Sequence, residues 1–444
     1  MLNKLRSAWA SVLMLSLLVV PDIGLAQRTN DPTLIGGLQP KQTVVGTELI
    51  RTMNQDGTSN ATRIGDVFTD VGMSRGAPSS RGGLGKLSTG LKRVLSRTGR
   101  VQWLMAGTSL TAGGGGGLAV GPGGGDSATS PNMKRSAAYP RQIANQLRAA
   151  GIPTRSDAVI GSGNQSAYAN PVTDATAYYE GQVAVAGTVT IPSLGWPGGR
   201  GWLLGDATAK WTFAPLIAAD QVEFYVVDMT GGAYTITDAA GAVLGTYVST
   251  GNFAKRKITL NRPASVGPLT INVTAGSLYV LGAVPSLTFA PMVEILNAGA
   301  YGSSSAYWNN FTALSPGDWI SYISPDFVSF EIGANDANSS VAASTFQTNT
   351  TAFLAGCKAF ADVMVIKSNK SIGQNGTGYD LSAAYLAALD ASAAAVGSVM
   401  TLDFNTLSAS FSASDWFDST GPHLAGQGYA KEGVYGAARV LTAF

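Results

Sequence analysis

The stretch VQWLMAGTSL, residues 101–110, decides the fold of this 444-residue chain. Its first six residues form a largely apolar run, which predicts a buried strand, and Ser109 follows that strand almost at once. An amphipathic helix is expected over residues 139–150, ended by Gly151, and a short strand over residues 157–160. A strand, a turn and a helix in this order are typical of an α/β domain, where Ser109 would lie at the carboxyl end of a sheet.

The same rhythm returns between residue 291 and residue 444. Strands are predicted at residues 292–296, 327–332, 363–367 and 399–403, and helices at residues 341–361, 381–396 and 428–441. Strands that alternate with helices predict a parallel sheet covered by helices on both faces.

Residues 171–290 interrupt this domain with a different pattern. Short β-rich runs follow one another at about ten-residue spacing, and no segment of helical period separates them. The pattern predicts an all-β, jelly-roll-like sandwich inserted between residues 101–170 and 291–444 of the α/β domain. Its tryptophans are expected to pack in its core, with stacking on sugar rings, as in a carbohydrate-binding module, as the alternative: Trp196, Trp202 and Trp211.

The composition excludes several classes of protein. Lysine and arginine number 29 and acidic residues 27, a net charge of +2, which excludes a strongly basic nucleic-acid binder and an acidic disordered chain. The single cysteine, Cys357, excludes a disulfide scaffold and a multi-cysteine zinc site, and we expect it to be a buried core thiol. The single histidine, His423, excludes a multi-histidine metal centre, so any histidine chemistry passes through this residue.

The N-terminal part does not look like an enzyme domain. Residues 1–26 resemble a secretory signal peptide, with basic residues, an apolar run and a small-residue cleavage site. The run is shorter than the about 20 residues of a bilayer-spanning helix, so no stable membrane span is expected. Residues 27–100 are expected to form an attachment segment followed by a flexible linker, because residues 75–100 carry seven basic residues, no acid and many glycines and serines.

Ser109 can act as a nucleophile only beside a base, and that base needs an orienting acid. His423 is the available imidazole, and the acidic residues before it are Asp418 and Asp415. An oxyanion intermediate also needs N–H donors that are fixed in advance. The candidate donors all follow predicted strands: the Asn335 side chain and the backbone of Gly302 or Gly163.

Four motifs in this order resemble the SGNH (GDSL-type) hydrolases. They are Gly107-Thr-Ser-Leu110, Asn297-Ala-Gly-Ala-Tyr-Gly302, Gly333-Ala-Asn335-Asp336 and Asp418 with His423. The resemblance implies a flavodoxin-like three-layer α/β/α fold and hydrolysis of carboxylic esters without a metal or an organic cofactor. It also implies the role of each site residue: Ser109 as nucleophile, His423 as general base, Asp418 as the acid, and an oxyanion hole made by the N–H groups of Ser109 and Gly302 with the Asn335 side chain.

The chain departs from the family pattern beside the nucleophile and before the histidine. Thr108 stands where the family usually has aspartate. The family's acid usually lies three residues before the histidine, where this chain has Thr420, so Asp415 remains an alternative to Asp418. Ser127 ends a literal Gly-Asp-Ser tripeptide, but no predicted strand leads into it, and Ser109 is the preferred nucleophile.

These features predict a serine esterase that removes O-acyl groups, acetyl in particular, from a surface polysaccharide. Residues 46–67 resemble the leader of bacteriophage tail-fibre and spike proteins. That resemblance implies an extracellular or virion-associated protein, phage tail proteins as partners and a homo-oligomer such as a trimer. The alternatives are a non-catalytic glycan-binding virion protein and a secreted bacterial lipase or thioesterase.

Overall fold

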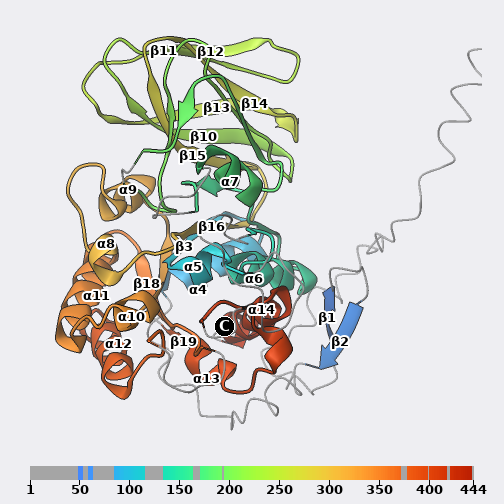
Figure 1. The fold of residues 1–444 in the computed structure, drawn as a ribbon. Coiled ribbons are helices and arrows are strands. Elements are labelled where there is room, and N and C mark those ends of the chain that lie inside the picture. Colours follow the sequence, from blue (N-terminus) through green and yellow to red (C-terminus); the bar gives the residue numbers. More distant parts are fainter. Residues whose placement is uncertain are drawn as a thin grey trace, which may run out of the picture. The chain divides into compact units, whose positions relative to one another are not determined.

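A six-stranded parallel sheet forms the centre of the α/β part (Figure 1). The computed structural model describes residues 49–53, 59–63, 85–115, 134–163, 171–192, 195–371, 378–398, 400–417 and 421–442. From edge to edge, the sheet consists of β19 (Thr401–Asp403), β18 (Asp362–Lys367), β17 (Phe327–Ile332), β3 (Val101–Gly107), β16 (Val293–Gly299) and β4 (Thr154–Arg155). Without the short edge strand β4, this is the flavodoxin-like order 2-1-3-4-5, so the predicted fold class is confirmed.

Helices cover both faces of this sheet, which explains the continuous apolar run in β3. Leu104 belongs to a core cluster with α11 (Ala343–Lys358) and α12 (Ala383–Ala395). Its neighbour Trp103 belongs to a second cluster with α6 (Tyr139–Ala149) and α14 (Gly426–Thr442). A strand buried on both faces has no polar side to show in the sequence. The covering helices are α6, α11, α12 and α14. Cys357 of α11 is buried, as predicted for a core thiol, and burial raises the pKa of this thiol.

Part of the N-terminal segment is ordered against this core. The prediction of a flexible linker over residues 75–100 was wrong for α4 (Gly85–Leu95), whose Leu91 and Val94 are buried in the cluster that contains Trp103. The many basic and small residues of this segment made the short apolar stripe of the helix difficult to identify from the sequence. Strands β1 (Leu49–Met53) and β2 (Ser59–Arg63) pair antiparallel.

The predicted signal peptide of residues 1–26 lies outside the described residues, and the virion location also stays a prediction. None of the helices in the described part of the chain has the length and hydrophobicity that crossing a membrane requires.

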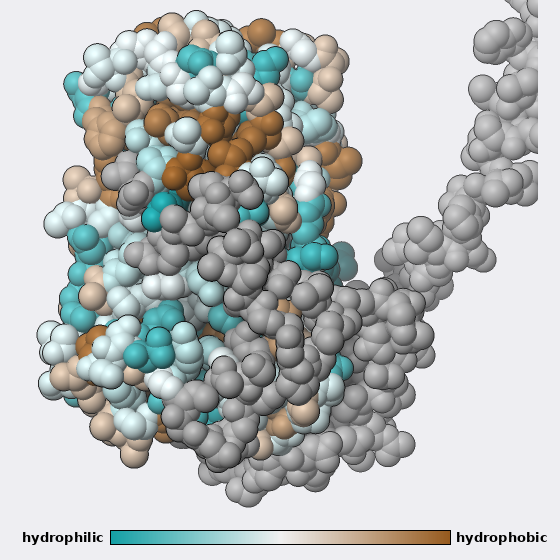
Figure 2. Space-filling model, viewed as in Figure 1, coloured by the Kyte–Doolittle hydropathy of each residue, from teal (hydrophilic) through white to brown (hydrophobic). Residues whose placement is uncertain are grey.

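The insert consists of two antiparallel sheets that enclose a core of their own. One sheet has the order β13-β10-β15-β8-β7 with β5 beside β15, and the other has the order β12-β11-β14-β9-β6. Their strands are β5 (Val159–Ile160), β6 (Val183–Ala186), β7 (Val189–Thr190), β8 (Trp202–Leu204), β9 (Lys210–Phe213), β10 (Ala219–Asp228), β11 (Ala233–Thr237), β12 (Val243–Val248), β13 (Lys255–Ser265), β14 (Leu269–Ala275) and β15 (Leu278–Ser286). On the face shown in Figure 2, hydrophobic surface gathers mainly over this insert.

The tryptophans predicted for the insert are fully buried, so core packing is the correct interpretation and stacking on sugars is wrong. Trp202 and Trp211 contact each other at 5.6 Å between ring centroids, inside the cluster that both sheets share. Trp196 packs instead in the core cluster of the α/β part, against Trp319.

Short elements near residue 157 connect the insert to the α/β part. The short strand predicted at 157–160 is β5, and it pairs antiparallel with β15 of the insert instead of joining the parallel sheet. Asp157 is buried and accepts hydrogen bonds from the Arg155 guanidinium at 2.8 and 2.9 Å and from the N–H groups of Leu216 and Ile217. This buried charge therefore joins β4, the edge strand of the parallel sheet, to a loop of the insert.

Candidate active site

The turn after β3 holds the predicted nucleophile. Ser109 is the first residue of the short helix α5 (Ser109–Ala112), at the carboxyl end of the central strand (Figure 1). The Thr108 side chain caps this helix by accepting a hydrogen bond from the Leu110 N–H at 3.3 Å. Gly113 ends it with φ of 94°, a left-handed conformation that favours glycine. The open α/β sheet therefore presents Ser109 where such sheets bind ligands.

Ser109 and His423 lie in direct contact although 314 residues separate them. The His423 Nε2 atom is 2.9 Å from the Ser109 Oγ atom, which is hydrogen-bond distance. The Tyr301 ring stacks on the imidazole, with ring centroids 5.6 Å apart and an angle of 19° between the ring planes. A Cβ on Gly114 would lie 2.7 Å from the His423 Cδ2 atom, so only glycine allows the turn to approach the imidazole this closely.

Buried hydrogen bonds fix the chain around His423. The Phe417 N–H donates to the His423 carbonyl at 3.1 Å, and the buried Asn369 side chain donates to the Pro422 carbonyl at 2.7 Å. The Tyr429 hydroxyl donates to the Gly114 carbonyl at 2.7 Å. Sequence reasoning missed Asn369 and Tyr429, because a lone amide and a lone phenol carry no motif.

The two predicted oxyanion donors, the side-chain amide of Asn335 and the backbone N–H of Gly302, lie beside each other. The Asn335 Nδ2 atom donates to the Ser303 carbonyl at 2.8 Å, next to Gly302, which turns with φ of 78°. The Ala300 N–H donates to the Gly107 carbonyl at 2.9 Å, which ties this turn to the turn of the nucleophile. Among the described residues, neither the Ser109 N–H nor the Gly302 N–H has an acceptor. Both groups are therefore available to a ligand.

Gly163, the alternative oxyanion donor, is committed elsewhere. Its N–H donates to the Gly198 carbonyl at 2.6 Å, and its own carbonyl accepts the Tyr301 N–H at 2.9 Å. The alternative is therefore wrong, because an N–H that already donates within the protein cannot also donate to an oxyanion. Gly163 instead supports the segment that carries the Tyr301 ring.

The two candidate acids differ in what the structure describes. Asp415 is buried, and its carboxylate accepts hydrogen bonds from the Ser412 N–H and from Lys431 Nζ, both at 2.7 Å. These contacts cap the short helix η1 (Ala413–Asp415), so Asp415 has a structural task. Asp418 lies outside the described residues.

Asp336 also has a structural task. Its carboxylate accepts hydrogen bonds from the N–H and the hydroxyl of Ser305, and burial raises its pKa. Within the described part of the chain, no three His, Cys, Asp or Glu side chains are grouped so that they could hold a metal ion.

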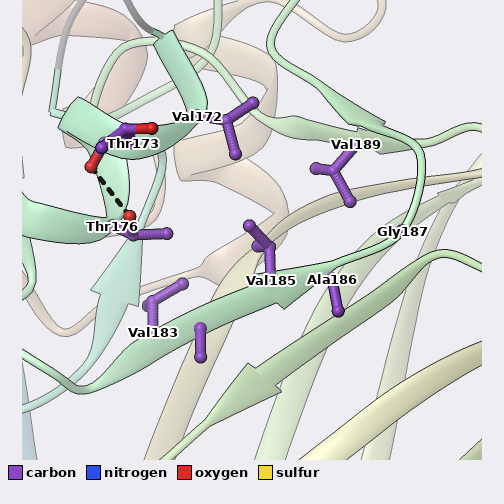
Figure 3. Close-up of a pocket in the computed structure, with 9 residues that line it drawn as sticks. Val172, Thr173, Thr176, Val183, Val185, Ala186, Gly187 and Val189 are labelled. Atoms are coloured by element: carbon purple, nitrogen blue, oxygen red, sulfur yellow. Dashed lines mark hydrogen bonds between the residues drawn. The ribbon is translucent and has the colours of Figure 1, made fainter.

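A hollow of about 540 Å³ lies in the insert, between α7 (Pro171–Tyr178) and β6 (Figure 3). Its lining is apolar or neutral, with Val172, Val183, Val185 and Val189 around it. It contains neither a nucleophile with a base nor a charged group. The lining residues of this hollow therefore offer no catalytic pair.

A buried carboxyl, Glu432 of α14, lies near the site without any hydrogen-bond partner for either oxygen among the described residues. Burial raises its pKa well above the ordinary value, and the nearby carboxylate of Glu331 raises it further. A buried carboxyl of this kind stays neutral instead of ionising.

Replacing Glu432 by glutamine is expected to remove a loss of stability at higher pH. Because the pKa is raised in the folded state, the wild type keeps its full stability below the ordinary glutamate pKa and loses stability as the pH rises towards the folded pKa. Relative to the variant, the free energy of unfolding should fall by up to about 1.4 kcal/mol per pH unit in that window. Denaturant unfolding of both proteins between about pH 5 and about pH 8 measures this. A difference that does not change with pH would contradict it.

Comparison with known proteins agrees with this architecture. No family model matches the chain, and no curated protein matches it. The chain folds like a peptidoglycan O-acetylesterase. That solved structure superposes with a TM-score of 0.59 at 13% sequence identity, over 82% of this chain and 98% of the other. The similarity supports the α/β fold with a β-rich insertion.

Two other solved structures match smaller parts of the chain. A family two carbohydrate esterase from Clostridium thermocellum, in complex with cellohexaose, has a TM-score of 0.29 at 10% identity, over 55% of this chain and 96% of its own. The module CsCBM6-3 from Clostridium stercorarium, in complex with cellobiose, has a TM-score of 0.21 at 21% identity, over 24% of this chain and 90% of its own. At these scores neither structure carries an argument.

Proposed function

We propose that this protein is a serine esterase that removes O-acyl groups, acetyl in particular, from a polysaccharide. The observation that carries the proposal is the 2.9 Å contact between Ser109 Oγ and His423 Nε2, the pairing that turns a hydroxyl into a nucleophile. The N–H group of Gly302 follows β16 and the Asn335 amide follows β17, the two strands that flank β3, and both supply donors of the kind that acyl transfer needs.

The reaction would proceed in two halves. Ser109 Oγ attacks the ester carbonyl carbon while His423 Nε2 takes its proton, and the oxyanion forms opposite the N–H groups of Ser109 and Gly302 and the Asn335 amide. His423 then gives the proton to the leaving sugar oxygen, which leaves an acyl group on Ser109. Water attacks this acyl-enzyme with His423 again as the base, and the carboxylic acid departs. We assign Asp418 the role of orienting the imidazole.

The substrate class is proposed from two features of the chain. The first is the fold, which is similar to that of a peptidoglycan O-acetylesterase. The second is the β sandwich that follows the nucleophile segment in the chain. The buried carboxylate of Asp157 joins this sandwich to the α/β part. We therefore favour an O-acetylated polymer over a free lipid. A secreted lipase or thioesterase and a glycan-binding virion protein remain the competing functions.

Comparison of acyl chain lengths and of polymers tests this function. We expect p-nitrophenyl acetate to be hydrolysed faster than the octanoate by about tenfold or more, and acetate to be released from O-acetylated xylan or O-acetylated peptidoglycan. A preference for octanoate would favour the lipase. Binding of these polymers without release of acetate from any of them would favour the adhesive virion protein.

A further inference from the structure

Glu331, near the end of β17, is a fully buried carboxylate directly beneath the turn of the nucleophile. Its Oε2 atom accepts hydrogen bonds from the Thr108 N–H at 3.0 Å, from the Thr108 hydroxyl at 2.7 Å and from the Thr111 hydroxyl at 3.1 Å. Its Oε1 atom accepts the hydroxyl of Ser368, which follows β18. A backbone N–H can only donate, so the Oε2 atom is the acceptor of the Thr108 N–H.

These contacts hold Thr108, the residue that precedes Ser109. The Thr108 hydroxyl donates to Glu331 and accepts from the Leu110 N–H, so it cannot rotate without breaking one of the two bonds. The Thr108 N–H is held by the same carboxylate oxygen. The carbonyl of the Thr108–Ser109 peptide accepts the Ala112 N–H at 3.0 Å. Glu331 holds the N–H and the side chain of Thr108, so it contributes to the orientation of this peptide and with it to the direction of the Ser109 N–H.

Two buried titratable groups lie near Glu331. Glu432 of α14 is the nearby carboxyl, and its raised pKa keeps it neutral. Tyr139 of α6 holds its hydroxyl 2.9 Å from Thr111 Oγ1, and its own pKa is raised by burial and by Glu331. A charge-assisted hydrogen bond in such a dry setting is stronger than one between neutral groups.

We propose that Glu331 is a positioning residue that aims the Ser109 N–H and hydroxyl at the substrate by holding Thr108 from below. The inference rests on the proposed esterase function and adds a residue that touches neither substrate nor His423. It also gives a physical role to Thr108, which occupies the position beside the nucleophile. The Ser109 N–H would donate to the oxyanion of the transition state and not to the ground-state ester. Loss of the Glu331 contacts is therefore expected to lower kcat and to leave KM unchanged.

Glu331→Gln tests the proposal, with Ser329→Ala as its matched control. Ser329 lies on the same strand and is buried. Its hydroxyl accepts a hydrogen bond from the Trp103 Nε1–H at a distance of 2.9 Å, and this contact does not involve the nucleophile. Glutamine keeps the shape of Glu331 but loses the charge and presents N–H where Glu331 accepts. Kinetics on p-nitrophenyl acetate, normalised to the sites that a fluorophosphonate titrates, should show kcat lowered about tenfold to a hundredfold in Glu331→Gln, with KM within about twofold.

The control should keep the wild-type kcat per titrated site while melting at a lower temperature. A wild-type kcat in Glu331→Gln, or an equal loss of kcat in Ser329→Ala, would overturn the proposal. If the wild type hydrolyses no ester, the proposed esterase function is wrong. The positioning role of Glu331 is then tested by the rate at which fluorophosphonate labels Ser109. Slower labelling in Glu331→Gln supports the role, and equal labelling overturns it. Should Glu331→Gln not fold, Thr108→Val removes a donor to the same carboxylate and should lower kcat in the same way.

Discussion

Replacing Ser109 by alanine is expected to lower kcat for p-nitrophenyl acetate by about 10⁴ to 10⁶-fold, as for other nucleophiles that act as a unit with their base. The substitution removes the oxygen that lies 2.9 Å from His423 Nε2. What activity remains would come from the N–H donors of the site. Stability should change by only about 1 kcal/mol, because one hydrogen bond of a small side chain is lost.

Ser127→Ala is the matched control for this experiment. Ser127 carries the literal Gly-Asp-Ser tripeptide, and its replacement should leave the rate unchanged if the strand before Ser109, and not the tripeptide, marks the nucleophile. Mass spectrometry after fluorophosphonate treatment should find the label on Ser109 in the wild type and in Ser127→Ala. Equal hydrolysis rates for Ser109→Ala and the wild type would refute the assignment.

Replacing His423 by alanine is expected to have the second largest effect, a loss of about 10³ to 10⁶-fold in kcat. No other imidazole exists in the chain to take the proton from Ser109. The fluorophosphonate should also label Ser109 far more slowly in the variant, because the hydroxyl then lacks its base. Unchanged labelling and turnover would show that some other group activates Ser109.

Two further substitutions serve as controls for His423 and identify its acid. Asp418→Asn should lower kcat by about 10²- to 10⁴-fold, the range that follows when the imidazole loses its orienting carboxylate. Asp415→Asn removes an acceptor from Lys431 and from the cap of η1, so it should lower the melting temperature and leave kcat per titrated site unchanged. The opposite outcome would make Asp415 the acid.

The strands of the parallel sheet could be predicted because their surroundings are the same on both sides. β3, β17 and β18 are buried against helices above and below, and this appears in the sequence as continuous apolar runs. β5 could not be assigned to its sheet in this way. A strand of two residues has no pattern of its own, and only its partner β15 decides where it belongs.

The sequence by itself determined which chemistry was available: one imidazole, one serine at the end of an apolar strand, and an asparagine and a glycine after two further strands. Only the tertiary structure decided which donors and acids are free to take part. It engages the Gly163 N–H with Gly198 and the Asp415 carboxylate with Lys431, and it places Glu331 under Thr108. The physical reason is that the residue type determines which hydrogen bonds a group can donate or accept. The neighbours in the folded structure determine whether those hydrogen bonds are already made within the protein.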